Sequence, residues 1–350
     1  MPDIPDHRPQ FPTERPRIAV LGVGAIAQTA HLPAYEKYGL EVVGVWSRTP
    51  ATAERARDRF PSVGRVYESA EELLADPEVD IVDLATRPEG RERWLAAAVE
   101  AGKHVLAQKP LTHEPEAVRP VLDRADAAGV RIAVNQNARW APGWRLATRL
   151  VEEGAVGEVV GVTHLHDKPL PPIAGTHFDD LPHMLLSDYL VHWLDITRCW
   201  LAGKDVAWLS ASDHRVPGQP ETAKNPWSAT VEAVCGDGAS ALVRVVGDVR
   251  TRTPSCPYWI HGTEGSVRGS LLGRDFVELE RDGTTTRFAT EGQWFVDGFA
   301  GAMGELMCAI AEEREPYHSA RNNLATLALV DAARTSASRD GARIDLGLTL

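Results

Sequence analysis

Lys109, Asp188 and His192 are residue types that move protons and stabilise negatively charged oxygen, and two of them are spaced to act together. Asp188 and His192 are four residues apart in a segment expected to be helical, with Asp195 three residues further on, so the three side chains project from one face. A histidine titrates near neutrality and suits general acid and base catalysis, while a neighbouring carboxylate orients its ring and stabilises its protonated form. Spacing alone leaves another interpretation open, in which Ser187 or Asp188 caps the helix and His192 packs in the core.

Lys109 directly follows residues 104–108, which are expected to form a strand of a parallel sheet. Open α/β sheets bind ligands at the carboxyl ends of such strands. An ammonium group there can bond the reacting oxygen and stabilise alkoxide charge, an effect worth about 3 to 4 kcal/mol in other sites. Pro110 restricts the backbone beside Lys109 and helps to aim it. These groups suit the oxidation of an alcohol, which also needs a hydride acceptor; the alternative for Lys109 is a surface lysine in a turn.

A candidate loop for binding the hydride acceptor lies near the N-terminus, where the apolar residues 17–21 run into Gly22-x-Gly24-x-x-Ala27. Gly22 permits a tight turn, Gly24 lets the backbone approach a pyrophosphate, and Ala27 is small enough for the next helix to pack on its strand. The N-terminus of that helix offers free N–H groups and partial positive charge to the anion. The predicted cofactor is therefore NAD or NADP, bound by Gly22, Gly24, Ala25, Ile26 and Ala27.

The choice between NAD and NADP depends on the residues after the second strand, where an acid accepts the ribose 2′-hydroxyl and a cation accommodates a 2′-phosphate. This chain has Ser47 and Arg48 there and no acid, which mildly favours NADP. Arg48 also has the geometry to stack on the adenine of either cofactor. Thr86, Gln108 and Lys109 end two further strands and are expected along the dinucleotide.

Strand and helix patterns alternate over the first 135 residues, which predicts a parallel sheet covered on both faces, because parallel strands need crossover connections. From residue 158 the pattern changes to one long helix, 188–201, and a series of strands with hairpin turns at Gly236–Gly238 and Asp282-Gly283. The predicted fold class is α/β, with a doubly wound Rossmann sheet followed by an α+β domain built on a large, mainly antiparallel open sheet. The uncovered face of that sheet is expected to bind further subunits, giving a homodimer or homotetramer. The expected strands are 17–21, 40–46, 80–85, 104–108 and 130–134 in the first sheet, and 206–211, 229–235, 240–246, 258–261 and 276–280 in the second.

These patterns divide the chain into three expected parts. Residues 1–15 are rich in proline and charge and are expected to form a flexible N-terminal arm. Residues 16–137 are expected to form the NAD(P)-binding Rossmann domain, and residues 138–350 the α+β domain for substrate binding and oligomerisation.

Polar residues near the junction of the two domains are candidates for substrate contacts. Arg139 has donors for hydroxyl groups or a carboxylate and Trp140 has a face for a sugar ring, although a structural role for both is equally open. His166 and Asp167 end an expected strand and are two further candidates. His164 and His166 share one face of that strand, but a catalytic zinc site needs three convergent ligands and no third is apparent, so no metal is predicted.

The composition limits the classes of protein that remain. A chain of 350 residues with 43% hydrophobic and 25% charged residues is typical of a soluble globular protein with two domains. The net charge of −12 argues against nucleic-acid binding, which needs a concentrated basic surface. Apolar runs of roughly five to seven residues are too short for a membrane helix of roughly 20, and the N-terminus lacks the apolar core of a signal peptide. Four widely spaced cysteines without a C-x-x-C motif fit reduced thiols in the cytoplasm.

Motifs spread over residues 15–345 resemble those of the Gfo/Idh/MocA group, which comprises glucose-fructose oxidoreductase, inositol dehydrogenase and rhizopine-catabolism proteins. The resemblance implies a Rossmann domain that binds NAD(P), a second domain whose open sheet commonly forms dimers or tetramers, and hydride chemistry on sugars, polyols or related alcohols. It also implies that Lys109, Asp188 and His192 carry the reaction. The motifs are Gly22-x-Gly24-x-x-Ala27, Ala101-Gly102-Lys103-His104-Val105, Lys109-Pro110, Asp188-x-x-x-His192-x-x-Asp195 and Gly262-Thr263-Glu264-Gly265.

Two residues depart from the pattern of that group. Gln108 stands where a glutamate usually precedes Lys-Pro, and Arg91 stands where a histidine often opens the following helix. Gln108 keeps the hydrogen-bonding reach of a glutamate but not its charge, so Lys109 is less strongly biased toward its protonated form. Neither change removes a catalytic group.

Three functions remain open from the sequence. The first is a dehydrogenase or reductase that acts on a sugar, cyclic polyol or related alcohol. The second is a glycosidase that oxidises its sugar transiently and regenerates the cofactor in each turnover. The third is a non-enzymatic regulator that senses the dinucleotide, against which the presence of Lys109, Asp188 and His192 argues, because a sensor needs no proton relay.

Overall fold

The structure is a computed structural model and describes residues 5–170, 173–247 and 254–350. Contacts divide the chain into two compact units. The first, called here the parallel-sheet unit, comprises Arg8–Ala141 and Gly292–Leu324; the second, called the mixed-sheet unit, comprises Pro142–Glu291 and Ala325–Leu350 with the described residues 5–7. Residues 292–324 thus belong to the same unit as Arg8–Ala141. The sequence pattern instead predicted that all of residues 138–350 form the second domain.

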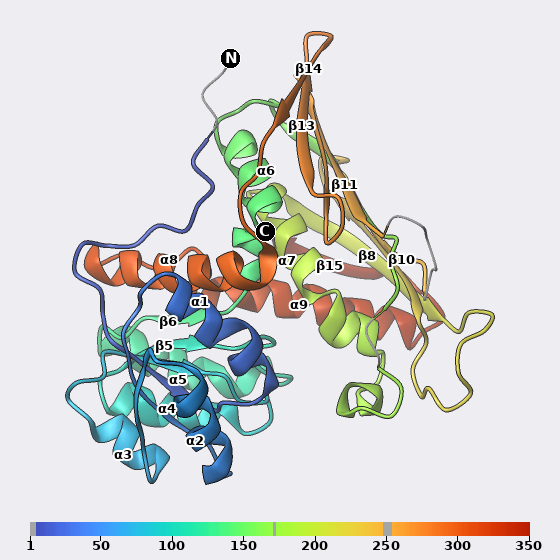
Figure 1. Ribbon diagram of the computed structural model, residues 1–350. Coiled ribbons are helices and arrows are strands. Elements are labelled where there is room, and N and C mark those ends of the chain that lie inside the picture. Colours follow the sequence, from blue (N-terminus) through green and yellow to red (C-terminus); the bar gives the residue numbers. More distant parts are fainter. Residues whose placement is uncertain (1–4, 171–172, 248–253) are drawn as a thin grey trace. The chain divides into compact units, whose positions relative to one another are not determined.

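The parallel-sheet unit is a Rossmann fold. Its strands pair in parallel in the order β3-β2-β1-β4-β5-β6, and β1 and β4 are buried along their whole length. Helices cover both faces of the sheet (Figure 1). The strands are β1 (Ile18–Leu21), β2 (Val42–Trp46), β3 (Val63–Val66), β4 (Ile81–Leu84), β5 (His104–Ala107) and β6 (Ile132–Val134), and the helical segments between them are η1 (Ala27–His31), α1 (Leu32–Lys37), α2 (Pro50–Arg59), α3 (Ala70–Ala75), α4 (Arg91–Glu100) and α5 (Pro115–Ala127). The predicted alternation of strand and helix is confirmed.

The sequence analysis missed β3 and α3. In β3 two of four residues are exposed, so it lacks the apolar run that marked the other strands. A signal for α3 was present: the Ser69 hydroxyl accepts a hydrogen bond from the backbone of Glu72, and the Glu72 carboxylate accepts one from the backbone of Glu68. Ser69-x-x-Glu72 has the sequence of a capping box, which marks a helix start, although the Glu72 carboxylate bonds the backbone of Glu68 rather than that of Ser69.

A C-terminal segment completes the core of the parallel-sheet unit. It contains η5 (Trp294–Gly298), α8 (Phe299–Ala311) and the start of α9 (Ala320–Ala337). Phe299, Met303 and Met307 of α8 pack in one cluster with strand residues such as Val20. The stretch Trp294–Ala311 is long and apolar enough to cross a membrane, but 67% of it is buried in the described structure. Glycines and a glutamate interrupt its apolar residues, so the sequence analysis saw no such stretch.

The N-terminal residues of this unit also make contacts. The Phe11 ring lies 5.5 Å from that of Tyr38, and the Arg15 guanidinium donates to the Tyr38 carbonyl over 2.8 Å. In the described part of the expected arm Phe11 and Arg15 therefore have partners, which differs from the expectation of flexibility there; residues 1–4 of the expected arm lie outside the described residues.

The mixed-sheet unit is built on a sheet with the strand order β14-β13-β12-β11-β7-β10-β9-β8-β15. Only β7 and β10 pair in parallel, and the other neighbours are antiparallel, as predicted. Helices α6 and α7 and the second part of α9 lie along one face (Figure 1). The remaining elements are α6 (Pro142–Glu152), β7 (Val159–His166), η3 (His177–Asp180), η4 (Leu185–Tyr189), α7 (Val191–Trp200), β8 (Asp205–His214), β9 (Ser228–Cys235), β10 (Ser240–Val245), β11 (Cys256–Gly262), β12 (Ser266–Leu271), β13 (Phe276–Arg281), β14 (Thr284–Phe288) and β15 (Ile344–Thr349).

Burial along these strands distinguishes the covered face from the open one. In β10 exposed and buried residues alternate strictly, as expected for a sheet with one covered face. Both predicted hairpins are present, β9 to β10 and β13 to β14, and Asp282 and Gly283 have the positive φ angles of a tight two-residue turn. Leu242 in β10 and Val160 in β7 are 39% and 44% exposed.

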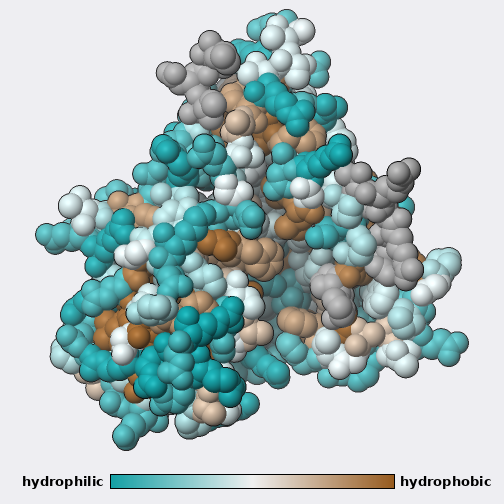
Figure 2. All heavy atoms as spheres, viewed as in Figure 1, coloured by the Kyte–Doolittle hydropathy of each residue, from teal (hydrophilic) through white to brown (hydrophobic). Residues whose placement is uncertain are grey.

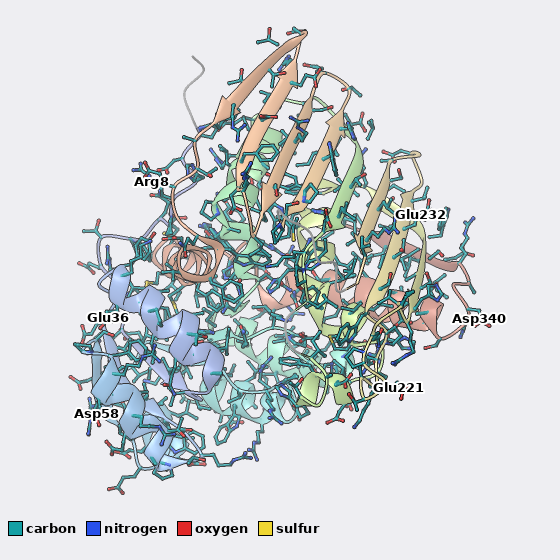
Figure 3. The ribbon with its side chains drawn as sticks, turned by 45° about the vertical axis from the view of Figure 1, so that its right-hand side comes forward. Arg8, Glu36, Asp58, Glu221, Glu232 and Asp340 are labelled. Carbon is teal, nitrogen blue, oxygen red and sulfur yellow. The ribbon has the colours of Figure 1, made fainter. Side chains whose placement is uncertain are left out.

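Many charged side chains lie on the outside of the two units, although some, such as Asp83 and Arg91, are buried. The labelled carboxylates, among them Glu36, Asp58, Glu232 and Asp340, point away from the chain (Figure 3). On the face in Figure 2 hydrophilic residues predominate, and apolar residues form small areas between them.

Candidate active site

The carboxyl ends of β1, β2, β4 and β5 bring together most of the predicted cofactor-binding residues. The strand order reverses between β1 and β4, and open α/β sheets bind ligands at such a switch point. The Gly22 backbone N–H bonds the Trp46 carbonyl over 2.8 Å and so joins the ends of β1 and β2. Gly22 has φ +101°, and a Cβ there would lie 3.1 Å from Thr86 and 3.2 Å from Ala85. This position therefore requires glycine.

Gly24 and two buried side chains fit a dinucleotide at this edge. A Cβ at Gly24 would meet nothing within 4 Å, so the space over the loop is open. The Thr86 Oγ1 and Gln108 Oε1 atoms are buried without a hydrogen-bond partner among the described residues. Buried polar atoms normally have partners, and a bound ligand is one way to supply them. Helix residues Ala25 to Ala27 follow the loop, with Ala27 fully buried.

Substitutions at the two glycines are expected to separate loop strain from direct obstruction of the cofactor. Gly24→Ala meets no neighbouring atom, so the melting temperature stays within a few degrees of wild type while the Kd for the dinucleotide rises about tenfold or more, because the new Cβ occupies the path of the pyrophosphate. Gly22→Ala lowers the melting temperature and also raises the Kd, because φ at this position is strained for any residue but glycine. Thermal unfolding and calorimetric titration measure the two effects. Gly236→Ala is the control, since its Cβ meets only a carbonyl at 4.0 Å; wild-type affinity in Gly24→Ala contradicts the predicted position of the pyrophosphate.

The end of β2 carries the residues predicted to choose between NAD and NADP. Ser47 is partly exposed and Arg48 is exposed. Helix α2 follows at once, with no acidic residue in its first turn. A helix N-terminus without acids attracts an anion, so the surroundings of Arg48 are compatible with a phosphate group.

Lys109 lies just beyond the end of β5, at the same edge as Thr86 and the glycine loop, and is partly exposed. Its peptide bond to Pro110 is cis. The buried Arg91 guanidinium donates hydrogen bonds to backbone carbonyls on both sides of Lys109. The sequence analysis noted Arg91 only as a departure from a family pattern, because no local signal indicates carbonyls that lie 17 to 20 residues away.

Asp188 and His192 lie in the mixed-sheet unit and are both partly exposed. Asp188 belongs to the π-helical turn η4, and His192 belongs to α7, which begins at Val191. The expected single helix over 188–201 is therefore two segments, and the spacing of a regular α-helix does not apply between Asp188 and His192. Single π turns of this kind are frequent at functional sites.

The alternative in which Ser187 or Asp188 caps the helix is wrong. Leu190 occupies the position before α7, and no side chain caps the helix there. The Ser187 hydroxyl instead donates to the Pro182 carbonyl over 2.7 Å. Asp195 is buried and accepts a hydrogen bond of 2.6 Å from Thr326, so this member of the motif has a structural contact.

His166 is hydrogen-bonded to Tyr189, a residue of the same π turn as Asp188. Its Nε2 atom lies 2.7 Å from the hydroxyl of Tyr189, whose ring stacks on Trp193 at 5.6 Å. Burial and the nearby Lys168 lower the pKa of His166 to about 4, so the neutral ring accepts the bond and the Tyr189 hydroxyl donates it. His166 is only 1% exposed, which the sequence did not indicate.

His164, the other histidine of this strand, stacks on Trp200 at 5.4 Å. It is 1% exposed, and burial lowers its pKa to about 3. Among the described residues no group of three or more His, Cys, Asp and Glu side chains is arranged to hold a metal ion. His164 is thus a neutral member of an aromatic cluster.

The two buried histidines are expected to make unfolding sensitive to pH. Their pKa values in the folded protein lie below the unfolded value of about 6.5, so the unfolded chain takes up protons first as the pH falls. The contribution of the two neutral histidines to the free energy of unfolding is therefore fully present above about pH 6.5. Below that pH the free energy of unfolding declines toward pH 4, by up to about 1.4 kcal/mol per pH unit for each histidine. Urea unfolding at several pH values measures this. His164→Phe is expected to flatten the decline and the exposed His261→Gln to leave it unchanged; an unaltered profile in His164→Phe contradicts the prediction.

The remaining substrate candidates have structural contacts. The Arg139 guanidinium donates to the Tyr317 carbonyl over 2.7 Å and to the Asn322 side chain over 3.0 Å. Trp140 is buried with its ring 4.7 Å from that of His318. Asp167 forms an antiparallel bridge with Ser255 through backbone bonds. These contacts account for Arg139 and Trp140 within the core of the parallel-sheet unit.

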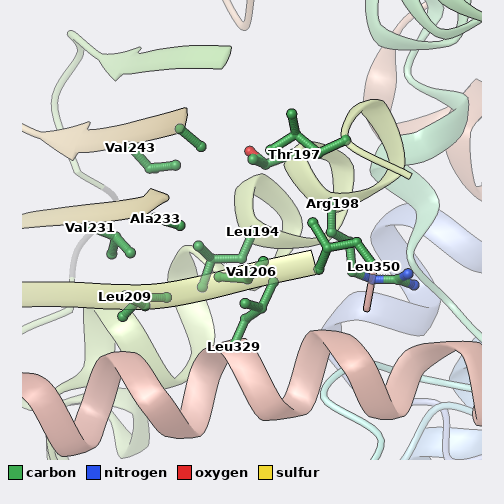
Figure 4. Close-up of a pocket in the computed structure, with 12 residues that line it drawn as sticks. Leu194, Thr197, Arg198, Val206, Leu209, Val231, Ala233, Val243, Leu329 and Leu350 are labelled. Atoms are coloured by element: carbon green, nitrogen blue, oxygen red, sulfur yellow. The ribbon is translucent and has the colours of Figure 1, made fainter. Parts of the chain in front are cut away.

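A pocket of the mixed-sheet unit lies between α7, α9 and strands β8 to β10 (Figure 4). Apolar side chains such as Leu194, Val231 and Leu329 line it, and none of the predicted site residues does. It is a gap in the packing between helices and sheet.

A glycine loop at the switch point of a doubly wound sheet, with a lysine at the same edge, defines the class of dinucleotide-binding oxidoreductases. Two family models agree with this class: "Oxidoreductase family, NAD-binding Rossmann fold" matches residues 16–136, and "GFO/IDH/MocA C-terminal domain" matches residues 144–268. The chain belongs to the Gfo/Idh/MocA family, and it is an enzyme of the dehydrogenase and reductase class that acts on CH–OH groups.

Similar proteins span nearly the whole chain. The 1,5-anhydro-D-fructose reductase of Ensifer adhaerens is 28% identical and covers 95% of this chain and 99% of its own length. An inositol 2-dehydrogenase of Paracoccus denitrificans is 26% identical over 85% of this chain and 94% of its own. An oxidoreductase from Agrobacterium radiobacter, solved with NAD+, L-tartaric acid and magnesium, has the same fold, with a TM-score of 0.81 and 23% identity over 95% of this chain and 98% of its own.

Proposed function

We propose that this enzyme transfers a hydride between a nicotinamide cofactor and a sugar, cyclic polyol or related alcohol. The observation that carries the proposal is the shared edge of the parallel sheet, where Gly22, Gly24 and the unpartnered oxygens of Thr86 and Gln108 lie with Lys109. The relatives named as reductase and dehydrogenase of sugar-like alcohols support the substrate class. The bound dinucleotide supplies the hydride acceptor or donor.

Two groups of this chain then act on the substrate. Lys109 Nζ bonds the reacting oxygen and stabilises the charge that develops on it as the hydride moves. His192, oriented by Asp188, takes the hydroxyl proton during oxidation and returns it during reduction. In support, both His192 and Asp188 are partly exposed, whereas His164 and His166 are buried and held neutral.

We infer a preference for NADP from Arg48. Its exposed guanidinium at the end of β2, the neighbouring Ser47 hydroxyl and the acid-free first turn of α2 suit a 2′-phosphate. The open face of the mixed sheet, with Val160 and Leu242 exposed on paired strands, supports self-association as a dimer or tetramer. The four cysteines form no disulfide among the described residues, which supports a cytoplasmic location.

The testing experiment is calorimetric titration with NAD(H) and NADP(H), followed by an absorbance screen at the nicotinamide band with sugars and polyols. Tighter binding of NADP(H) and net turnover with a member of either substrate class are expected. Tight binding without net turnover would favour a glycosidase cycle or a sensor. No binding of either dinucleotide would refute the assignment of the glycine loop.

A further inference from the structure

Arg91 joins the segment that carries Lys109 to the segment that follows β4. It is the first residue of α4 and is only 1% exposed. Its Nη1 atom donates to three carbonyls after β5, the longest of these bonds being 3.1 Å, and its Nη2 atom donates to one carbonyl after β4. The four carbonyls belong to Gln108, Pro110, Leu111 and Thr86.

These carbonyls belong to irregular backbone and need a donor that reaches both segments. Buried carbonyl groups are costly to leave without hydrogen bonds. A guanidinium holds its donors rigidly in one plane, so one side chain can bond several carbonyls and fix their relative positions. Among the described residues Arg91 forms no ion pair with a carboxylate, so its hydrogen bonds go to this backbone alone.

We propose that Arg91 is a positioning residue for Lys109. Its guanidinium holds the segment Gln108–Leu111 against Thr86, and the backbone on both sides of Lys109 is therefore fixed before substrate arrives. The inference rests on the proposed function of Lys109, whose ammonium must lie close to the reacting oxygen. A displacement of about 1 Å at such a group can cost about 100-fold in rate, so a rigid backbone has a kinetic effect.

The matched comparison is Lys103, a second cation that bonds backbone carbonyls. Its Nζ atom donates to the carbonyls of Asp76 and Val79, both over 2.8 Å. Lys103 directly precedes β5, whereas Arg91 bonds the segment that follows it, so Lys103 acts at the opposite end of the strand. Lys103→Met therefore removes a similar contact away from Lys109.

Hydrogen exchange tests whether Arg91 fixes the segment Gln108–Leu111, and this test does not depend on activity. In Arg91→Met we expect the amides of Gln108, Lys109, Leu111 and Thr112 to exchange about tenfold faster or more than in wild type, since the segment loses the hydrogen bonds of the guanidinium. In Lys103→Met those amides should keep their wild-type rates. Unchanged exchange of these four amides in Arg91→Met overturns the proposal.

Kinetics then test whether the effect of Arg91 on kcat is exerted through Lys109. Arg91→Met should lower kcat about tenfold or more, and guanidinium ion added to Arg91→Ala should restore part of the loss. In a Lys109→Met background, Arg91→Met should change kcat by less than about twofold, because coupled residues are not additive. A full tenfold loss in that background overturns the proposal. If Lys109→Met alone retains its kcat, the proposed function fails, while the exchange result still decides whether Arg91 fixes the segment.

Discussion

Replacing Lys109 by methionine is expected to lower kcat by about 100- to 1,000-fold, the usual effect of removing one donor to a developing oxyanion. Methionine keeps much of the length and apolar stem of lysine but has no donor and no charge. Because Lys109 is partly exposed beyond the end of β5, the loss of packing should be small and the melting temperature near that of wild type. Steady-state rates with the substrate found in the absorbance screen measure the effect.

Two further measurements test whether a loss of kcat in Lys109→Met comes from the missing ammonium group and not from weaker cofactor binding. Lys109→Arg retains the charge but not the compact ammonium, so its kcat should also fall, because the two cations differ in shape and donor geometry. The Kd of Lys109→Met for the dinucleotide should stay within a few-fold of wild type. A kcat within about threefold of wild type in Lys109→Met would show that another group stabilises the reacting oxygen.

His192→Ala is expected to reduce kcat by about 100-fold or more and to leave the affinity for the cofactor nearly unchanged. The reason is that the proposed function assigns the proton transfer to His192, which lies in the mixed-sheet unit, whereas the predicted cofactor residues lie in the parallel-sheet unit. Added imidazole should restore part of the activity, since it can replace the missing base. Turnover and calorimetric titration of the same preparation measure both quantities.

Asp188→Asn provides the matched variant for His192. An amide keeps the shape of the carboxylate but cannot stabilise a protonated imidazole, so kcat should fall while cofactor affinity is retained. If cofactor binding collapses in His192→Ala, the residue is structural. In that case His192 supports the fold of α7 rather than the reaction.

Much of the fold follows from local patterns in the sequence. The parallel sheet was predictable because buried strands and crossover helices alternate. Both hairpins were predictable because their turns contain residues with positive φ that few residue types allow, namely Gly238 in one and Asp282 and Gly283 in the other. Gly22 was identified for the same reason, as its φ of +101° confirms. β3 was missed because exposed residues interrupt it, and α8 because glycines interrupt its apolar stretch.

The arrangement of the candidate site was less predictable from the sequence than the fold, because it depends on contacts between residues distant in sequence. The sequence offered Asp188 and His192 as neighbours on one helix, but the backbone changes from π to α between them, which hydrogen bonding in the folded chain decides. The sequence predicted His166 as a substrate contact, whereas the structure buries it and bonds it to Tyr189, 23 residues away in sequence.

By itself, then, the sequence determined the residue types, the turns and the order of elements, because these depend on neighbours within a few positions. Only the tertiary structure decided the surroundings of Arg91, since four backbone carbonyls on two loops leave no trace in side-chain pattern. It also decided that Arg139 bonds the backbone of Tyr317, 178 residues away. Hydrogen bonds of a long polar side chain depend on which segments folding brings within about 3 Å of it, and local sequence does not encode that distance.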